Sequence, residues 1–368
     1  MDVGAFSSDY ETARARFRRA AQEGACELES IDLPADRAGK QLTIDVALAG
    51  SPSCSRALVI SSGLHGVEGF LGSAVQIAAL DPVAGSRFRP EDVRLVFIHS
   101  LNPFGFRALR RVDENNVDLN RNFLLSGEQY RGAADYYNQI EPLLNLSGPP
   151  KIFDLYFARL AYGFLRYGQA QMKDAIAGGQ YEDEKGLFFG GHRPSPTQSL
   201  LEDHLPRWIG EATEVLHLDF HTGLGRWGTY KLILDYPTDS PDFERLTEEF
   251  GEDILEPSEP VNAISYHKRG GLGPWCQQLL PHASYHLLVA EFGAYPGAIS
   301  LWALRKENQS HWHRHPSSLR YKLAKQILKE VFAPASPRWR KRAIDQSLSL
   351  IGKAIQVCQQ SAQMITAL

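Results

Sequence analysis

The sequence predicts an α/β protein in one domain spanning 1–368, with a central mixed, mostly parallel twisted sheet, flanking helices and a helical insertion. Apolar stretches with strand character alternate with helical patterns from about residue 40 to 120, as in βαβ units. The strand pattern stops near residue 124 and resumes at residue 214, so the intervening segment interrupts one sheet. With 43% apolar residues among 368, the chain can bury a core of this size.

An N-terminal helix of about 15 residues is predicted first, because Ser8 and Glu11 have the spacing of a capping box and Gly24 stands where a helix would end. The predicted strands, with one helix at 69–79 among them, follow at 41–50, 56–63, 93–103, 214–221, 230–236 and 285–293. Ligands of open α/β sheets bind beyond the carboxyl ends of the strands, so residues at these ends are candidates for a site.

The segment from about 124 to 210 has apolar residues at helical spacing and then a loop-rich stretch, so we expect a helical insertion there. A C-terminal helix is expected at about 340–368, because apolar residues recur with alternating spacings of four and three at positions 344, 348, 351, 355, 358, 362 and 365. This stripe fits a helix packed on its own sheet, and it also fits a homodimer formed through the helix. The spacing does not separate the two.

Charge and composition exclude several classes of protein. The 39 lysines and arginines against 43 acidic residues give a net charge of -4 with no long basic run, so no nucleic-acid partner is expected. No stretch approaches the roughly 18 consecutive apolar residues of a membrane span, and the N-terminus lacks an apolar signal core. We therefore expect a cytoplasmic protein without a membrane partner. The four cysteines have no CxxC spacing, so a metal would need histidine and carboxylate ligands.

Three predicted strands end in titratable residues: His65 and Glu68 follow one, His221 ends another and Glu291 ends a third. His65 and Glu68 are three positions apart, so in a helical turn both side chains lie on one face and can hold one ion. A catalytic zinc site uses three protein ligands and leaves a position for water. We therefore expect His65, Glu68 and His221 to bind one Zn2+ per chain. Asp219 shares a strand face with His221 and is a candidate to orient its ring.

The loop after the strand at 93–103 is rich in Asn and Asp and contains Arg111, Asn120 and Arg121. Guanidinium groups bind carboxylates in a bidentate manner and stabilise developing oxyanions. Beside a metal, such a loop suits a substrate whose carboxylate lies next to a scissile carbonyl. An Asn-Arg pair considered alone would more often be a surface turn.

Four blocks occur together in one order: HGVE, NPFGF through VDLNRNF, DFHTG and AEFG. Together they resemble the zinc carboxypeptidase superfamily, which includes the aspartoacylase and succinylglutamate desuccinylase deacylases. The resemblance implies a carboxypeptidase-like fold, zinc ligation by His65, Glu68 and His221, and a role for Glu291 as the general base and later the general acid. The helical insertion is foreign to digestive carboxypeptidases and indicates an uncharacterised, bacterial-looking branch.

The resemblance also assigns residues to the substrate. Arg111 matches the arginine that polarises the scissile carbonyl, and Asn120 and Arg121 match the pair that grips the substrate's carboxylate. Secreted carboxypeptidases use a tyrosine upstream of the catalytic glutamate. This chain offers Tyr266, 25 residues before Glu291, in surroundings that do not match the family.

The function expected from these residues is zinc-dependent hydrolysis of amide bonds. Such a metallocarboxypeptidase-like enzyme removes a C-terminal amino acid from a peptide or hydrolyses an N-acyl amino acid, and its partner is a peptide or small-molecule substrate with a free carboxylate. The alternative is an aspartoacylase-like deacylase or esterase that acts on small molecules only. A non-catalytic binding module would be marked by loss of a ligand or of the base, and none of His65, Glu68, His221 and Glu291 is missing.

Overall fold

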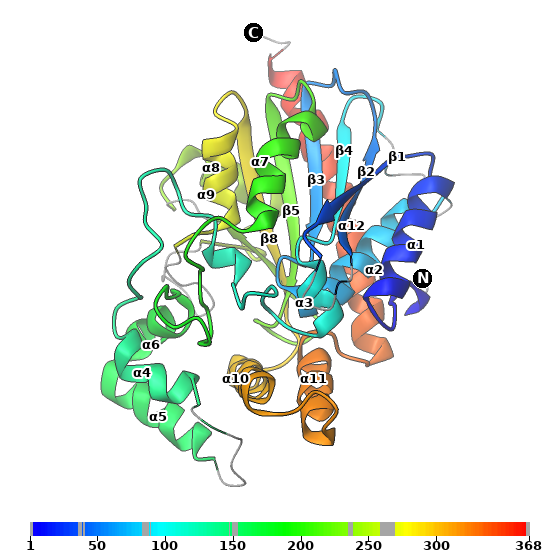
Figure 1. Ribbon diagram of the computed structural model, residues 1–368. Helices are drawn as coiled ribbons and strands as arrows, with labels where there is room; N and C mark the ends of the chain where they lie inside the picture. The colour runs from blue at the N-terminus through cyan, green and yellow to red at the C-terminus, as the bar shows by residue number, and fades with distance from the viewer. Residues whose placement is uncertain are drawn as a thin grey trace.

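The described part of the chain folds around one mixed sheet of eight strands in the order β1-β2-β4-β3-β5-β8-β6-β7 (Figure 1). The computed structural model describes residues 3–35, 39, 41–82, 88, 90–146, 148, 154–234, 238–257 and 269–365. The strands are β1 (Glu27–Leu33), β2 (Leu42–Ala49), β3 (Arg56–Ser62), β4 (Arg94–His99), β5 (Glu214–Thr222), β6 (Tyr230–Leu234), β7 (Leu255–Pro257) and β8 (Ser284–Phe292). The neighbours β4, β3, β5 and β8 run parallel, which confirms the predicted mixed, mostly parallel sheet.

The central strands are buried along almost their whole length, which explains why their sequences are nearly continuous runs of apolar residues. β4 is buried at every position and β5 at every position but its first. Helices cover both faces of a parallel sheet, so side chains on either face of these strands avoid water. The sequence does not predict the two edge strands. β1 mixes acidic with apolar residues and is at least partly exposed at every position, and the described part of β7 has three residues. Short or charged edges discourage pairing with other chains.

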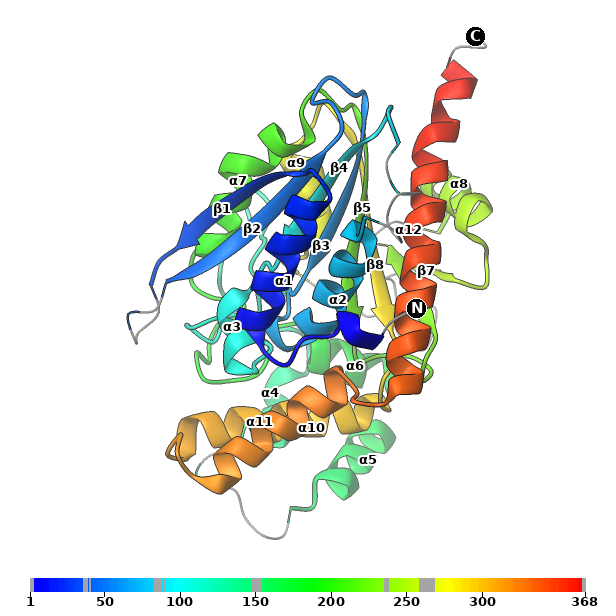
Figure 2. The same ribbon diagram turned by 90° about the vertical axis from the view of Figure 1, so that its right-hand side faces the viewer.

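One face of the sheet is covered by α1 (Tyr10–Glu23), α2 (Gly69–Leu80) and α12 (Pro337–Ile365) (Figure 2). In α12, the predicted stripe positions 344, 348, 351, 355 and 358 are buried in the same core as Leu58 and Leu218 of the sheet. This part of the stripe therefore packs on the chain's own sheet. The side chains at 362 and 365, and the last predicted helical residues 366–368, lie outside the described part.

The start of α1 differs from the prediction by one residue. Asp9 is the N-cap, and its carboxylate accepts a hydrogen bond from the backbone N–H of Thr12 at 2.8 Å. The predicted capping box of Ser8 and Glu11 is wrong, because an aspartate caps a helix as well as a serine and Ser8 donates its hydroxyl to Asp9 instead. The helix has 14 residues and ends at Gly24, as predicted.

The opposite face carries α7 (Pro196–Ile209) and α9 (Leu272–Leu279). α7 falls within the predicted insertion 124–210, yet its Leu201 and Trp208 pack in one core with Val59 and Val96 of the sheet. The other helices of this segment form a separate group away from the sheet (Figure 1). They are α4 (Tyr137–Leu144), α5 (Tyr156–Tyr167) and α6 (Gln169–Ala177).

Two further helices, α10 (Gly297–His313) and α11 (Leu319–Phe332), pack side by side beyond the carboxyl ends of β3, β5 and β8 (Figures 1 and 2). They share a buried apolar cluster with the group α4–α6, to which Leu143, Leu160, Leu301 and Leu328 belong. The carboxyl ends of the strands face this cluster. α8 (Pro241–Phe250) packs beside β7.

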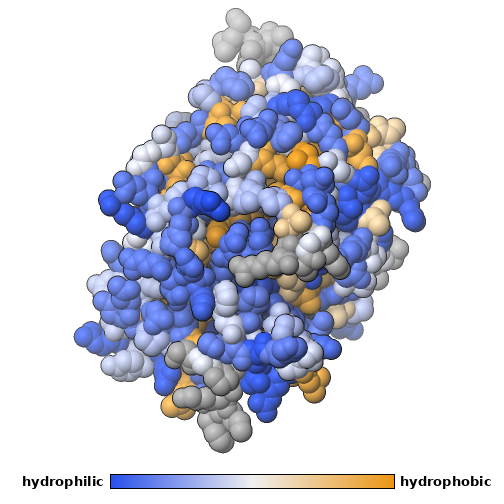
Figure 3. All heavy atoms as spheres, viewed as in Figure 1, coloured by the Kyte–Doolittle hydropathy of each residue, from blue (hydrophilic) through white to orange (hydrophobic). Residues whose placement is uncertain are grey.

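The face shown in Figure 3 is mostly hydrophilic, with small, separate apolar spots. Among the residues that the structure describes, none of the helices combines the length and the hydropathy needed to cross a bilayer.

Candidate metal centre and active site

Three adjacent strands bring the predicted site residues to one edge of the sheet. After β3 the chain turns through His65 into a short 3-10 helix, η2 (Gly66–Glu68). His221 lies near the end of β5, and its Cα pairs with that of Glu291 in β8. Paired residues of a parallel ladder point to the same face of the sheet, so these two side chains lie together.

His65, Glu68 and His221 are buried and face one another. Nδ1 of His65 lies 3.0 Å from Oε1 of Glu68 and 3.2 Å from Nδ1 of His221, which lies 3.1 Å from Oε2 of Glu68. Tetrahedral ligands about 2.1 Å from a zinc ion would lie about 3.4 Å apart. Among the described residues, these three form the one group of this kind able to hold a metal ion.

The second nitrogen of each histidine faces a buried carboxylate. Nε2 of His221 lies 2.5 Å from Oδ2 of Asp219, and Nε2 of His65 lies 3.2 Å from Oδ1 of Asp118 in a less well aligned contact. A carboxylate only accepts hydrogen bonds, so Nε2 of His221 donates to Asp219, and Nδ1 of the same ring is the atom left to bind a metal. Nδ1 of each ring and the Glu68 carboxylate face a common point that one cation can occupy. The donor set therefore fits zinc.

Arg111 lies between a metal ligand and Asp118. Its Nε donates to Oδ2 of Asp118 at 2.8 Å, and its Nη1 donates to Oε1 of Glu68 at 3.4 Å. Burial is the largest single influence on the Asp118 carboxyl and opposes its ionisation. Arg111, His65 and Arg121 together outweigh burial and hold the pKa of this carboxyl well below its usual value. Arg111 also lines the cavity described below, so a fixed cation is available to an incoming carbonyl oxygen.

Glu291 lies beside the ligands with its carboxylate partly engaged. Oε1 accepts a hydrogen bond from the backbone N–H of Leu224 at 2.8 Å, and the residue is buried. Burial, with a smaller contribution from the Glu68 carboxylate, raises the pKa of Glu291 to about 7. A cation at the three ligands would favour the ionised form and lower this pKa. Glu291 thus has the position and the acidity range of a general base.

The structure separates the predicted carboxylate-binding pair. Asn120, in the 3-10 helix η4 (Leu119–Arg121), lines the cavity. Arg121 is fully buried, donates from Nη1 to the carbonyl oxygen of Asn120 at 2.6 Å and is not among the described lining residues. Its side chain packs beside Gly179 as well as on its own loop. Tyr266 lies outside the described residues.

Sequence reasoning did not single out two residues that hold the site together, Asp118 and Thr222. Asp118 contacts both a metal ligand and Arg111, and the backbone N–H of Thr222 donates to Oε2 of Glu68 at 3.0 Å. Asp118 could have been found, because it stands two positions before Asn120 in the VDLNRNF block. Thr222 acts through its backbone, so no side-chain pattern reveals it.

The metal-ligand loop packs closely on the segment around α3 (Pro103–Ala108). The backbone N–H of Gly66 donates to the carbonyl of Arg111 at 3.0 Å, and that of Val67 donates to the carbonyl of Arg110 at 2.8 Å. A Cβ atom on Gly66 would lie 2.1 Å from the carbonyl carbon of Gly105. Only glycine allows this approach, so Gly66 sets the distance between the ligand loop and Arg111.

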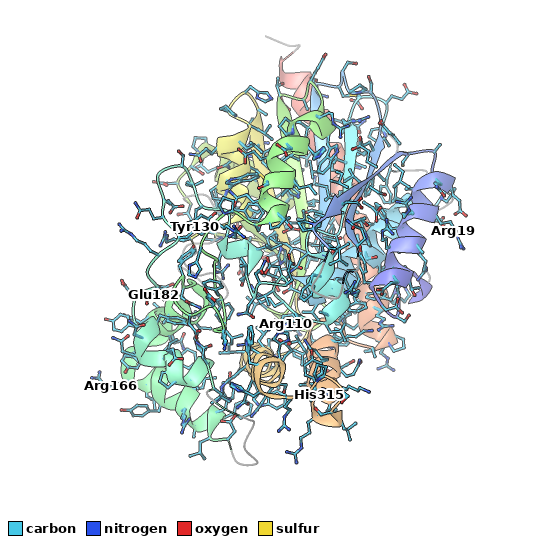
Figure 4. The ribbon with its side chains drawn as sticks, viewed as in Figure 1. Arg19, Arg110, Tyr130, Arg166, Glu182 and His315 are labelled. Atoms are coloured by element: carbon cyan, nitrogen blue, oxygen red, sulfur yellow. The ribbon has the colours of Figure 1, made fainter. Side chains whose placement is uncertain are left out.

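Arg110 ties the same segment to α10. Its Nε donates to Oε1 of Glu307 at 3.0 Å, and its Nη2 donates to Oδ1 of Asn308 at 3.0 Å. Figure 4 shows Arg110 immediately above α10. Lys325 of α11 pairs with the same Glu307 oxygen. The backbone of Arg110 therefore supports the ligand loop while its side chain fixes α10 and, through Glu307, α11.

Replacing Gly66 with alanine is expected to lower the unfolding temperature and to weaken zinc binding together. The new methyl group would meet backbone atoms of Gly105 and Phe106 at 2.1 and 2.2 Å, and overpacking of this kind costs about 1–3 kcal/mol. Thermal unfolding and zinc titration measure the two effects. Gly352→Ala is the matched control, because its nearest neighbour is the Phe88 ring at 3.4 Å within a helix. Equal behaviour of the two variants would contradict the packing argument.

A cavity of about 360 Å³ opens onto the site. This volume lies in the range of about 300–1,000 Å³ that is typical of small-ligand sites. The polar residues that line it beside the strand ends include His65, Glu68, Arg111, Asn120, His221 and Glu291. The arrangement can hold a metal, activate a water and stabilise charge on a carbonyl oxygen in one place.

The fold and the site together define a carboxypeptidase-like α/β protein. Carboxypeptidase A from Helicoverpa armigera superposes with a TM-score of 0.50 at 15% identity, over 94% of this chain and 73% of that one. Bovine thrombin-activatable fibrinolysis inhibitor (TM-score 0.46, 13% identity, 95% and 98% covered) and a metallo-carboxypeptidase from Pseudomonas aeruginosa (0.39, 12%, 91% and 69%) are also similar. At these identities the likeness shows a shared fold alone, and the first superposition carries it.

The chain belongs to the family described as "Protein of unknown function (DUF2817)", whose model matches residues 6–346. No curated protein matches the chain in the sequence comparison. This member of the family therefore has a carboxypeptidase-like fold and a group of residues suited to a metal.

Proposed function

We propose that this chain is a zinc-dependent hydrolase of amide bonds, acting on a peptide or an N-acyl amino acid with a free carboxylate. The observation that carries the proposal is the convergence of His65, Glu68 and His221 with Glu291 and Arg111 on one cavity. Each group has the chemical type that metal-assisted hydrolysis needs, and apart from His65 and Glu68, which are neighbours, each comes from a separate segment of the chain.

The residues would divide the reaction among them. When bound by His65, Glu68 and His221, zinc would supply a Lewis acid and lower the pKa of a water toward about 7. Glu291 would take the proton of the attacking water and pass it to the departing amine. Arg111 would stabilise the charge that develops on the carbonyl oxygen, and Asn120 would hold the substrate's carboxylate.

Two substrate types share this machinery, a peptide that loses its C-terminal residue and an N-acyl amino acid. The cavity of about 360 Å³ favours the smaller substrates. For the same reason, a deacylase or esterase that acts on small molecules only is the second candidate. A non-catalytic binding module is less well supported, because all three candidate metal ligands and Glu291 are present.

Zinc-loaded protein is expected to hydrolyse N-acyl amino acids, and to lose activity when the substrate's carboxylate is replaced by a carboxamide. The physical reason is the carboxylate recognition assigned to the loop of Asn120. Release of amine from N-acyl amino acids, their carboxamides, matched esters and tripeptides measures both points. Protein that holds one zinc per chain and cleaves no amide or ester would overturn the hydrolase and leave the binding module.

A further inference from the structure

The cavity has an apolar wall that the sheet does not supply. Helices α5, α6, α10 and α11 line it with Leu160, Phe164, Ile176, Leu301, Leu304 and Phe332. Among the described lining residues from these helices, Lys173 is the one that carries a charge. The cavity thus joins a polar metal site to an apolar chamber, which we define by the six residues above.

Buried ties hold this wall in place. Arg305 of α10 is only 1% exposed, donates from Nε to the carbonyl of Leu143 and pairs with Asp154. The hydroxyl of Tyr156, at the start of α5, donates to the carbonyl of Ala298 at 2.9 Å. These bonds fix α5 against α10 in the structure as it stands, so the apolar chamber is formed before any substrate arrives.

We propose that the substrate carries a bulky aliphatic or aromatic group that fills the apolar chamber, on the acyl or the amino-acid side of the scissile bond. The proposal rests on the proposed hydrolase function and names its substrate class. An apolar group leaves water here without stranding polar atoms of the wall, and each buried methylene raises affinity roughly fourfold. A polar group in the same place would lose its hydration and find few partners.

Two substrate series test the proposal: N-acylglycines from acetyl to octanoyl, and N-acetyl amino acids with linear side chains of increasing length. We expect kcat/KM to rise roughly fourfold per methylene in at least one series until the apolar chamber is full. The series that rises tells which side of the scissile bond faces the wall. A flat response in both series overturns the proposal.

Two leucines of α5 give a matched pair of variants. Leu160 lines the apolar chamber, whereas Leu165 on the same helix is 87% exposed. Leu160→Asn is expected to flatten the dependence on chain length, and Leu165→Asn is expected to keep it. The same dependence in both variants would place the apolar group elsewhere and overturn the proposal.

Binding of the two series to the Glu291→Gln variant, measured by calorimetry, separates this proposal from the hydrolase function. Tighter binding of longer chains without hydrolysis by the wild-type protein would overturn the hydrolase and support the apolar chamber. Hydrolysis with rates and affinities that ignore chain length would support the hydrolase and overturn the apolar chamber.

An independent observation is a run of buried hydrogen bonds across β3, β5 and β8 that ends at a metal ligand. Oδ1 of Asp219 accepts from the hydroxyl of Ser61 at 2.6 Å, and Oγ of Ser61 lies 2.6 Å from Nε2 of His217. Nδ1 of His217 lies 2.7 Å from the hydroxyl oxygen of Tyr285. The second oxygen of Asp219 lies 2.5 Å from Nε2 of His221.

The direction of every bond in this run follows from Asp219. Its carboxylate only accepts, so the hydroxyl of Ser61 must donate to it and the Ser61 oxygen is left to accept from Nε2–H of His217. A neutral His217 then presents an unprotonated Nδ1, to which the hydroxyl of Tyr285 donates. All donors therefore point toward Asp219, which holds the Nε2–H tautomer of His221 and leaves Nδ1 of that ring for the metal.

We infer that Ser61, His217 and Tyr285 are positioning residues for zinc, acting through Asp219 on His221. This inference concerns the affinity of the ligand set and needs no assumption about the substrate. Loss of a hydrogen bond behind a ligating histidine typically weakens metal binding about 10- to 100-fold. The effect should be largest at Ser61, which contacts Asp219 directly, and smaller at Tyr285.

Competition with a chelator measures the zinc affinity of Ser61→Ala and Tyr285→Phe, and thermal unfolding without zinc measures their stability. Tyr10→Phe is the control, because it removes a buried hydroxyl that donates to the carbonyl of Thr43 at 3.0 Å, away from the site. We expect about 10- to 100-fold weaker zinc binding in Ser61→Ala and unchanged affinity in Tyr10→Phe. Unchanged affinity in Ser61→Ala, or an equal loss in the control, would overturn the inference.

Discussion

Glu291→Gln is expected to lower kcat about a hundred- to ten-thousand-fold while zinc content and KM stay close to those of the wild-type protein. Glutamine keeps the size of the side chain and can still accept the hydrogen bond from the backbone N–H of Leu224, so the fold of the strand end is preserved. It cannot take a proton from water. Steady-state kinetics on the best N-acyl amino acid, with elemental analysis of the same sample, measures both quantities.

Glu182→Gln is the control for this variant. Glu182 is exposed and lies at the periphery of the molecule, away from the strand ends (Figure 4), so its loss of charge should leave turnover unchanged. If Glu291→Gln retained wild-type turnover with full zinc, Glu291 could not be the base. If it lost its zinc, the loss of turnover would report on the metal site instead.

His221→Ala is expected to remove zinc and all zinc-dependent activity, because two ligands remain where three are needed. The stabilisation that zinc gives the wild-type protein should vanish with it. For one site, ligand at 100 times its Kd contributes about 2.7 kcal/mol to the free energy of unfolding. Metal content per chain and thermal unfolding with and without zinc measure the change.

A second histidine variant tests whether this effect is specific. His315 is exposed beyond the end of α10 (Figure 4), so His315→Ala should keep one zinc per chain and the full thermal response. Retention of zinc by His221→Ala, with an unchanged response to added metal, would contradict the three-ligand site.

The central strands could be predicted from the sequence because burial on both faces demands uninterrupted apolar residues. β4 and β5 show this directly. β1 and β7 could not be predicted, because an edge strand pairs with one neighbour only and can carry polar residues on its exposed positions. The sequence likewise could not predict where the insertion ends. α7 has the periodicity of any amphipathic helix, and only its contact with Val59 and Val96 shows that it covers the sheet.

The candidate metal group could be predicted because its members end an apolar strand or follow it within six residues, and the sheet places strand ends together. Residues of the long segment after β4, such as Asn120 and Arg121, are not placed by a strand in this way. Arg121 follows Asn120 directly, yet the side chain of Asn120 lines the cavity and that of Arg121 is buried beside Gly179. The choice depends on tertiary packing around Arg121, which neighbouring residue types do not encode. The hydrogen-bond run through Ser61 joins three strands and appears only once their register is known.

The position of β8 has a consequence for how the chain can fold. β8 is the last strand in the sequence, yet it lies inside the sheet between β5 and β6. Until residue 292 has left the ribosome, β5 keeps an unpaired apolar edge and Glu291 is absent from the site. Unpaired strand edges can pair with other chains, so a nascent or truncated chain without β8 is prone to aggregate at the edge of β5. The same strand that completes the sheet therefore brings Glu291 beside the candidate metal ligands, which all come from earlier parts of the chain.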